Sequence, residues 1–396
     1  MSDYTLMATS SFGLESLVAL ELRKLGYERL LVENGKVTFS GNERDICRCN
    51  LWLRTADRIL IRMAQFRATD FEGLFQGVLS VPWEDMIPVN GKIVVTGRSV
   101  GSRLASVPDC QAVVKKAVVR AMTRKYRVTQ FPETGSLYKI EVALAKDLAT
   151  LTVDTTGPGL HKRGYRQDKG EAPLRENLAA ALVLLSRWTP ERILADPLCG
   201  AGTIAIEAAL IGRNKAPGLM RTFVSEAWHT IPKTIWDSAR SEALKKEELR
   251  SFRILASDSN GRIVKAARDN AFNAGVGELI GFQKLPVEDF KSGRKYGCIV
   301  CNPPYGDRMG SAEEIEKLYR SMGKVFGALD GWSLFILSAH PSFEVLFGRK
   351  ADKNRKLYNG NVKCYFYEYF GPLPRKKATD IEPGTKIDEQ TGRTTQ

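Results

Sequence analysis

The chain has 396 residues, of which 59 are Lys or Arg and 45 are Asp or Glu, giving a formal net charge of +14, and 43% are hydrophobic. These proportions are those of an ordinary globular protein and exclude wholesale disorder. The length exceeds the ~250–300 residues at which one hydrophobic core usually stops growing, so we expect two or more domains. No apolar run approaches the ~20 residues of a spanning helix. The first residues, MSDYTLMATSSFG, lack a signal-peptide pattern, so we expect a cytoplasmic protein with no membrane partner.

Residues 1–65 alternate in the order β-α-β-β-α-β, with a hairpin signal at Asn34-Gly35, which predicts a ferredoxin-like unit. Residues 66–155 continue with a helix, a strand, a basic helix and two strands. They contain neither a phosphate loop nor an acid/base cluster, which indicates a binding module. After a linker (156–189), strands, glycine turns and helices alternate through 190–371, the pattern of a doubly wound α/β sheet. Residues 372–396 show no apolar periodicity, and we expect them to be disordered.

Two basic runs lie in the folded part of the chain. Residues 111–127 hold six basic residues and no acid, and Lys116, Arg120 and Arg124 recur every fourth residue, so a helix would carry them as one stripe. Residues 349–363 form a second run that reads as a loop leading into a hairpin. Solvated surface is the alternative for each run, but two runs in a basic protein favour contact with a polyanion through its phosphates.

The cysteines and histidines predict no metal site. The chain has 7 cysteines and 3 histidines, and the histidines lie far apart in the sequence. Cys298 and Cys301 have metal-ligand spacing, but they lie in a buried-strand pattern and no second pair exists. We therefore expect reduced core cysteines.

The first chemical motif is the glycine turn Asp196-Pro-Leu-Cys-Gly-Ala-Gly-Thr203, directly after a strand. Glycines here allow a ligand to approach the backbone beside a helix N-terminus. No Lys-Ser/Thr pair follows, so the turn is not a P-loop. Gly200, Gly202 and Ala205 also meet the relaxed dinucleotide pattern, which leaves that alternative open.

Two acids follow at the ends of the next strands. Asp258 is placed to accept hydrogen bonds from a ribose, or alternatively caps a helix. Asp289 could receive an adenine amino group, or is a surface acid. Both acids follow the glycine turn in the order expected for a nucleoside site. The ribose interpretation of Asp258 and the adenine interpretation of Asp289 therefore support each other.

The sharpest motif is Asn302-Pro303-Pro304-Tyr305, after a fourth strand. The prolines fix the backbone, so the Asn oxygen and a carbonyl can accept two hydrogen bonds from one planar NH₂ group. Tyr305 offers a ring on which a base can stack. A plain proline turn explains the prolines but not the Asn and Tyr.

The order DPLCGAGT, SDSN, VEDF, NPPYG resembles the amino-methylating class of S-adenosylmethionine-dependent methyltransferases. Upstream, GLHKRGYR (159–166) and APLRENLA (172–179) are similar to the THUMP-domain RNA guanine-N2 methyltransferases. The likeness is to the N-terminal half of the bacterial 23S rRNA enzyme RlmL, and it covers about residues 1–371. It implies a Rossmann-like class I methyltransferase domain preceded by a ferredoxin-like unit and a THUMP domain.

The resemblance also implies roles for individual residues. The cofactor, S-adenosylmethionine, would be held by Asp196, Cys199, Gly200, Gly202, Thr203, Asp258, Asp289, Asn177 and Arg166. The target base would be held by Asn302, Pro303 and Tyr305. From the resemblance, His161 and Arg163 would contact the RNA near the cofactor entrance. From the charge pattern, the stripe of Lys116, Arg120 and Arg124 would contact its phosphates.

The expected reaction is methyl transfer to the N2 amine of a guanine, in rRNA rather than tRNA. The alternatives are a tRNA substrate, DNA adenine-N6 methylation, and a non-catalytic RNA-binding assembly factor. The sequence does not indicate the oligomeric state.

Overall fold

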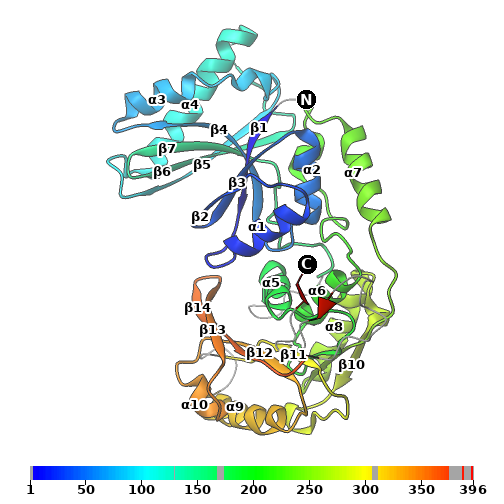
Figure 1. The fold of residues 1–396 in the computed structure, drawn as a ribbon. Coiled ribbons are helices and arrows are strands. Elements are labelled where there is room, and N and C mark those ends of the chain that lie inside the picture. The colour runs from blue at the N-terminus through cyan, green and yellow to red at the C-terminus, as the bar shows by residue number, and fades with distance from the viewer. Residues whose placement is uncertain are drawn as a thin grey trace.

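The computed structural model describes residues 3–128, 130–166, 174–305 and 311–373, with the backbone of 386–387 and 394–395. Two seven-stranded sheets lie in the two halves of the molecule (Figure 1). The short strands β15 (Lys386–Ile387) and β16 (Thr394–Thr395) pair with each other. The tail expected to be disordered, 372–396, otherwise lies almost wholly outside the described residues. Within the described part of the chain, no helix has the length and apolar character needed to cross a membrane.

The N-terminal half is one continuous sheet in the order β2-β3-β1-β4-β7-β6-β5. Its strands are β1 (Tyr4–Thr9), β2 (Leu31–Glu33), β3 (Lys36–Gly41), β4 (Arg58–Arg67), β5 (Lys92–Val100), β6 (Leu137–Ala145) and β7 (Leu148–Asp154). Its helices are α1 (Glu15–Lys24), α2 (Glu43–Trp52), α3 (Phe71–Leu79), η1 (Trp83–Asp85) and α4 (Val107–Tyr126). The order β2-β3-β1-β4 is the predicted ferredoxin-like arrangement. Strand β4 pairs with both β1 and β7, so the second unit extends the first, and the boundary expected between residues 65 and 66 falls inside β4.

The C-terminal half is the expected doubly wound sheet, in the order β10-β9-β8-β11-β12-β14-β13. The five neighbouring strands β10, β9, β8, β11 and β12 are parallel, and β14 runs antiparallel to β12. The strands are β8 (Leu194–Asp196), β9 (Ile254–Asp258), β10 (Ile280–Lys284), β11 (Cys298–Cys301), β12 (Ser333–Ser338), β13 (Lys353–Asn359) and β14 (Val362–Tyr369). The chain leaves β8 towards β9 and later returns on its other side with β11. This reversal creates a crevice at the carboxyl ends of those strands.

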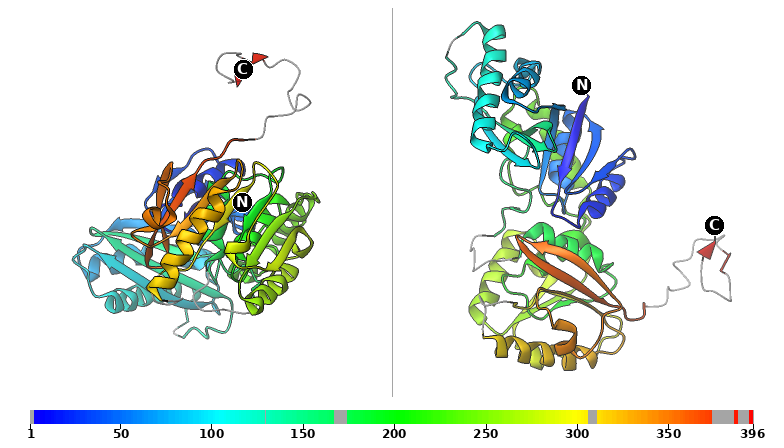
Figure 2. Two further views of the ribbon diagram at one scale, coloured as in Figure 1. Left: turned by 90° about the horizontal axis from the view of Figure 1, so that it is seen from below. Right: turned by 90° about the vertical axis from the view of Figure 1, so that its left-hand side faces the viewer.

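Helices cover both faces of this sheet. Apolar residues of α5 (Glu176–Leu185), α6 (Thr203–Gly212) and α8 (Gly261–Asn273) pack on one face. Those of α9 (Ala312–Gly327) and α10 (Phe343–Phe347) pack on the other, the lower face in the right-hand view of Figure 2. Strand β11 shows the alternation, because Val300 belongs to the first cluster and Ile299 to the second. Short turns η3 (Gly277–Leu279) and η4 (Val287–Asp289) flank β10.

One excursion of the C-terminal half packs on the N-terminal half, which the sequence did not predict. It contains η2 (Val224–Ala227) and α7 (Lys233–Lys245), and Figure 1 shows α7 beside α2. Trp228 stacks on Tyr138 with ring centroids 4.9 Å apart, and Phe223 stacks on Trp236 at 5.2 Å. The excursion therefore completes the N-terminal core.

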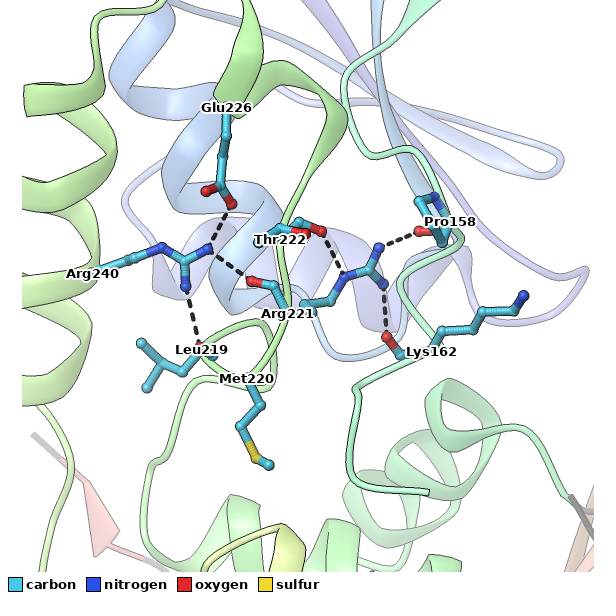
Figure 3. Close-up of a pocket in the computed structure, with 8 residues that line it drawn as sticks. All are labelled: Pro158, Lys162, Leu219, Met220, Arg221, Thr222, Glu226 and Arg240. Carbon is cyan, nitrogen blue, oxygen red and sulfur yellow. Dashed lines mark hydrogen bonds and ion pairs between the residues drawn. The ribbon is translucent and has the colours of Figure 1, made fainter. Parts of the chain in front are cut away.

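Arg221 fastens this excursion to the linker that follows β7, and Arg240 holds the excursion itself together (Figure 3). Arg221 donates hydrogen bonds to the carbonyls of Gly159 at 2.6 Å, Lys162 at 2.9 Å and Pro158. Arg240 donates to the Leu219 carbonyl at 3.1 Å and to Glu226 at 2.6 Å. A hollow of about 690 Å³ lies beside them. Both guanidinium groups beside this hollow are already bonded to the protein, and Arg221 acts as a brace between the excursion and the linker.

Candidate active site

The glycine turn, the acid of β9 and the Asn-Pro-Pro-Tyr segment meet at the carboxyl ends of β8, β9 and β11. They line one cavity of about 2010 Å³, larger than the roughly 300–1,000 Å³ of common small-ligand pockets. Eight of the residues predicted from the sequence line it: Asp196, Cys199, Gly200, Thr203, Asp258, Asn302, Pro303 and Tyr305. The cavity can therefore take a nucleoside cofactor together with a second planar group.

The glycine turn depends on backbone conformations that other residues rarely adopt. Gly200 has a φ of +49° and Gly202 a φ of +82°. A Cβ atom on Gly202 would lie 3.0 Å from the Cβ of Ala267 in α8. Gly202 does not line the cavity; it begins α6 and donates its N–H to the Cys199 carbonyl at 2.8 Å. It thereby keeps the turn tight and the helix close to α8.

The carboxylate of Asp258 is held by backbone N–H groups of the glycine turn and of the segment that follows β9. Its oxygens accept from Gly200 at 3.1 Å and from Asn260 at 2.9 Å. The Cys199 N–H donates to the Ser257 carbonyl at 2.9 Å, which adds a second link between the turn and β9. The acid is thus fixed at the cavity wall while its outer edge stays partly exposed.

Asp196 is an acid in an apolar place. Its side chain is 1% exposed and accepts a hydrogen bond from the Leu198 N–H at 3.4 Å. Burial raises its pKa well above the usual range, and the nearby Asp258 raises it further. A positively charged ligand group beside it would favour the carboxylate, so this wall of the cavity suits a cation.

Asn302 has an acceptor without a donor. Its Oδ1 is buried and no hydrogen-bond donor reaches it among the described residues. Buried acceptors are nearly always satisfied, so this one is available to a ligand N–H.

The rest of the Asn-Pro-Pro-Tyr segment is fixed by neighbouring elements. The Tyr319 hydroxyl of α9 donates to the Pro304 carbonyl at 2.8 Å. The Tyr305 hydroxyl accepts from the Asn359 amide of β13 at 3.0 Å. The ring of Tyr305 is therefore held in the cavity wall by the β13–β14 hairpin.

Two predicted cofactor residues lie just behind the wall. Arg166 donates to the Thr203 hydroxyl at 2.6 Å and to the Leu174 carbonyl at 3.1 Å. Asn177 is buried and donates to Asp57 at 2.8 Å, which links the two halves of the molecule. Direct cofactor contact by either stays a prediction.

Asp289 ends η4, and both it and its neighbour Glu288 are exposed, but of the two Glu288 is the one that lines the cavity. An adenine contact by Asp289 stays a prediction.

The structure corrects the expectation that Arg163 contacts RNA. Its side chain is 2% exposed, and its guanidinium pairs with Glu207 of α6 and donates to the carbonyls of Leu160 and Arg54. A guanidinium with these partners is a link between the two halves and is closed to a substrate.

The other residues assigned to the substrate differ in exposure. His161 is half-buried, and its Nδ1 has no hydrogen-bond partner among the described residues. Burial and then the nearby Arg175 lower its pKa to about 4. Lys116, Arg120 and Arg124 are all exposed on α4, at the far end of the N-terminal half from the cavity (Figure 1).

Sequence reasoning missed one wall of the cavity. Asn359, Gly360 and Val362 at the tip of the β13–β14 hairpin line it, as do Lys317 of α9 and His340 after β12. The hairpin was visible in the sequence, but its position beside Tyr305 follows from the placement of β14 next to β12. All seven cysteines are buried free thiols. No group of three or more potential metal ligands comes together among the residues described.

Comparisons with known proteins agree with this architecture. The RMKL-like methyltransferase domain family matches residues 163–368, the RlmL ferredoxin-like domain matches 5–60, and the THUMP domain matches 68–154. The Bacillus subtilis (strain 168) protein named "Putative RNA methyltransferase YpsC" is 50% identical over 384 residues, which are 96% of this chain and all of that protein.

Solved structures agree as well. SMU.472, crystallised with SAH, is 42% identical, with a TM-score of 0.90 over 95% of this chain and 100% of that one. A protein from Listeria monocytogenes str. 4b F2365, described as a predicted N6-adenine-specific DNA methylase, is 48% identical, with a TM-score of 0.90 over 94% and 97%.

The fold is thus that of a methyltransferase domain behind a joined ferredoxin-like and THUMP unit. The chain belongs to the RlmL-like family of THUMP-containing RNA methyltransferases.

Proposed function

We propose that this protein methylates the exocyclic N2 amine of a guanine in 23S rRNA, with S-adenosylmethionine as the methyl donor. The observation that carries the proposal is the buried, unpartnered Oδ1 of Asn302, placed next to Tyr305 in a cavity large enough for a cofactor and a base. The reaction would take place in the cytoplasm, whose reducing conditions suit seven buried free thiols.

The residues of the crevice fit S-adenosylmethionine. Gly200 would allow close approach of the methionine part, and Asp258 would accept hydrogen bonds from the ribose. Asp196 would face positive charge, and a bound cation would favour its ionised form. The SAH bound to the relative SMU.472 supports the same cofactor here. When bound, S-adenosylmethionine supplies an electrophilic methyl group on its sulfonium.

The residues on the other side would position the amine. Asn302 Oδ1 would accept one N–H of the planar NH₂ group, and the Pro303 carbonyl the other, which draws the nitrogen lone pair out of conjugation and towards the methyl group. Tyr305 would stack on the base, which must leave its own stack to enter the cavity. The chain's contribution is therefore position and orientation rather than covalent catalysis.

The proposal that the substrate is RNA rests on the N-terminal half of the molecule. A THUMP domain matches residues 68–154, and α4 presents its basic stripe to solvent. The match of residues 5–60 to the RlmL ferredoxin-like domain favours rRNA over tRNA. The Listeria relative's description makes adenine N6 in DNA the rival substrate. The test must therefore offer RNA and DNA side by side. A non-catalytic assembly factor would have no use for the unpartnered Asn302 acceptor.

The test compares Asn302→Ala with Asn90→Ala, an exposed control in the N-terminal half. We expect Asn302→Ala to lower the turnover of labelled-methyl transfer to RNA by about 100-fold or more, since losing one positioned hydrogen bond costs ~10²–10³ in rate at comparable sites. Binding of S-adenosylmethionine, measured by calorimetry, should not change. Wild-type turnover in Asn302→Ala would contradict the proposal, and transfer to DNA in preference to RNA would favour the rival.

A further inference from the structure

The outer face of the β13–β14 hairpin carries two lysines and two tyrosines in alternation. Tyr358 pairs across the strands with Lys363, and Lys356 pairs with Tyr365. Because side chains alternate along a strand, these four share one face. We call Lys356, Tyr358, Lys363 and Tyr365 the hairpin platform.

Each lysine of the hairpin platform lies over a tyrosine ring of its own strand. Lys356 Nζ is 5.5 Å from the centroid of Tyr358, and Lys363 Nζ is 5.0 Å from that of Tyr365. Both lysines are exposed and both tyrosines are partly exposed. Neither lysine has an ion-pair partner among the described residues. The face thus offers aromatic rings and uncompensated positive charge at the same place.

The sequence reinforces this imbalance of charge. From residue 353 to residue 367 the chain contains no acid. The first acid afterwards, Glu368, is 2% exposed and paired with Arg355 on the opposite face. The positive charge of the hairpin platform is therefore not neutralised by its own strands.

The tip of the same hairpin borders the active-site cavity. Asn359, Gly360 and Val362 line the cavity, and Asn359 holds the Tyr305 hydroxyl. Tyr358 directly precedes Asn359 in β13, so the platform begins one residue from the cavity wall, on the other face of the hairpin.

The hairpin is also rigidly supported. Leu357, Cys364 and Phe366 are buried on its inner face, and Phe12 of the N-terminal half packs edge-on against Tyr358 at 6.4 Å. Figure 1 shows the hairpin rising towards that half.

We infer that the hairpin platform binds single-stranded RNA immediately next to the target nucleotide, an inference that rests on the proposed function. Tyr358 and Tyr365 stack on the flanking bases, and Lys356 and Lys363 contact their phosphates. Stacking on aromatic rings tolerates any sequence, so the platform grips the strand and leaves the choice of base to the cavity. Neither role is part of the methyl transfer itself.

The test uses two double variants of the full-length protein. Lys356→Ala/Lys363→Ala removes the charges, and Tyr358→Leu/Tyr365→Leu removes the rings while keeping apolar bulk beneath them. Lys353→Ala/Lys350→Ala is the control, because both are exposed lysines of the same basic run outside the platform. The probe is a short, fluorescently labelled single-stranded oligoribonucleotide of mixed sequence, titrated at several salt concentrations.

We expect the lysine variant to reduce the slope of log binding constant against log salt by about 1.4, since each phosphate contact to a single strand contributes ~0.7. The tyrosine variant should weaken binding about 10-fold or more at constant slope. The control should retain the wild-type slope and affinity.

Wild-type slope and affinity in both platform variants would overturn the inference. The Asn302→Ala variant distinguishes a failure of this inference from a failure of the proposed function. It should bind the oligoribonucleotide like the wild type and yet lose methyl transfer. If Asn302→Ala keeps full transfer activity, the proposed function fails, while the salt slopes still decide on the platform.

Discussion

Gly202 shows how one residue controls the turn that lines the cavity. Its φ of +82° strains the backbone of any residue with a side chain, and a Cβ atom there would lie only 3.0 Å from the Cβ of Ala267. We expect Gly202→Ala to lower the free energy of unfolding by about 1–3 kcal/mol, because it adds a strained backbone to a close contact. Urea unfolding measures the loss, and calorimetry should show weaker binding of S-adenosylmethionine.

Gly327→Ala is the control for that prediction. Gly327 ends α9 without a left-handed backbone, and a Cβ there meets no atom within 4 Å. Replacing glycine at such a position stabilises by about 0.4–1 kcal/mol. A Gly202→Ala variant as stable as Gly327→Ala would mean that the turn does not need its glycine.

His161 makes a contribution to the free energy of unfolding that depends on pH. Its pKa is about 4 in the folded chain and near 6.5 when unfolded, so between these values the unfolded chain binds more protons. This contribution is fully present above pH 6.5 and is lost as pH falls towards 4. We expect His161→Gln to lose less stability than the wild type between pH 7 and pH 5 in urea unfolding. Exposed His229→Gln is the control, and an equal loss in all three proteins would contradict the assignment.

At the residue scale, the sequence predicted the placement of residues that strand order decides. Asp258 ends one strand of a parallel sheet and Asn302 follows another, so sequence order alone brings both to the crevice. Arg163 lies in an equally distinctive motif, but its role depends on Glu207 of another helix, which no local pattern reveals.

At the element scale, helix α4 places basic residues that recur every fourth position on one exposed face. Lys116, Arg120 and Arg124 are exposed, and apolar residues such as Val114 and Val118 are buried on the opposite side. We expect Lys116→Ala/Arg120→Ala/Arg124→Ala to weaken binding to ribosomal RNA and to reduce the salt slope by up to about 2.7, at ~0.9 for each contact with a duplex.

A charge-matched variant, Arg23→Ala/Lys24→Ala/Arg29→Ala, controls for the loss of net charge, since these residues are exposed elsewhere on the N-terminal half. An equal drop in slope for both triple variants would mean that the stripe has no special place in RNA binding.

Local signals predicted the elements well. Asn34-Gly35 produced the predicted hairpin of β2 and β3. The hairpin of β13 and β14 was also visible. Its function as a cavity wall was not, because that depends on pairing between β12 and β14.

At the scale of the whole molecule, the two halves share a core. Trp228 comes from the C-terminal half but is 2% exposed beneath β6, and its Nε1 donates to the Leu137 carbonyl at 3.0 Å. We expect Trp228→Ala to cost about 3–5 kcal/mol and to reduce hydrogen-exchange protection in β6 and α2.

Trp188→Ala is the matched control, because Trp188 is 5% exposed in the core of the C-terminal sheet. Its loss should reduce protection in β8 and β9. If Trp228→Ala instead reduces protection mainly in the C-terminal sheet, the shared core is not the unit that the contacts suggest.

The sequence predicted the order of the units along the chain but not that the two halves share a hydrophobic core. Alternation of strands and helices marked the two sheets, yet Phe223, Trp228 and Trp236 looked like ordinary residues of the second domain. The stacking partner of Trp228 is Tyr138, 90 residues earlier in the chain, and such long-range packing has no local signature.

The most direct test of the central claim is the quantification of N2-methylguanosine in purified 23S rRNA and tRNA from cells with and without the gene. We predict loss of one N2-methylguanosine from 23S rRNA without the gene, and its restoration by the wild-type protein but not by Asn302→Ala. Unchanged N2-methylguanosine in rRNA, or loss from tRNA alone, would contradict the proposed function.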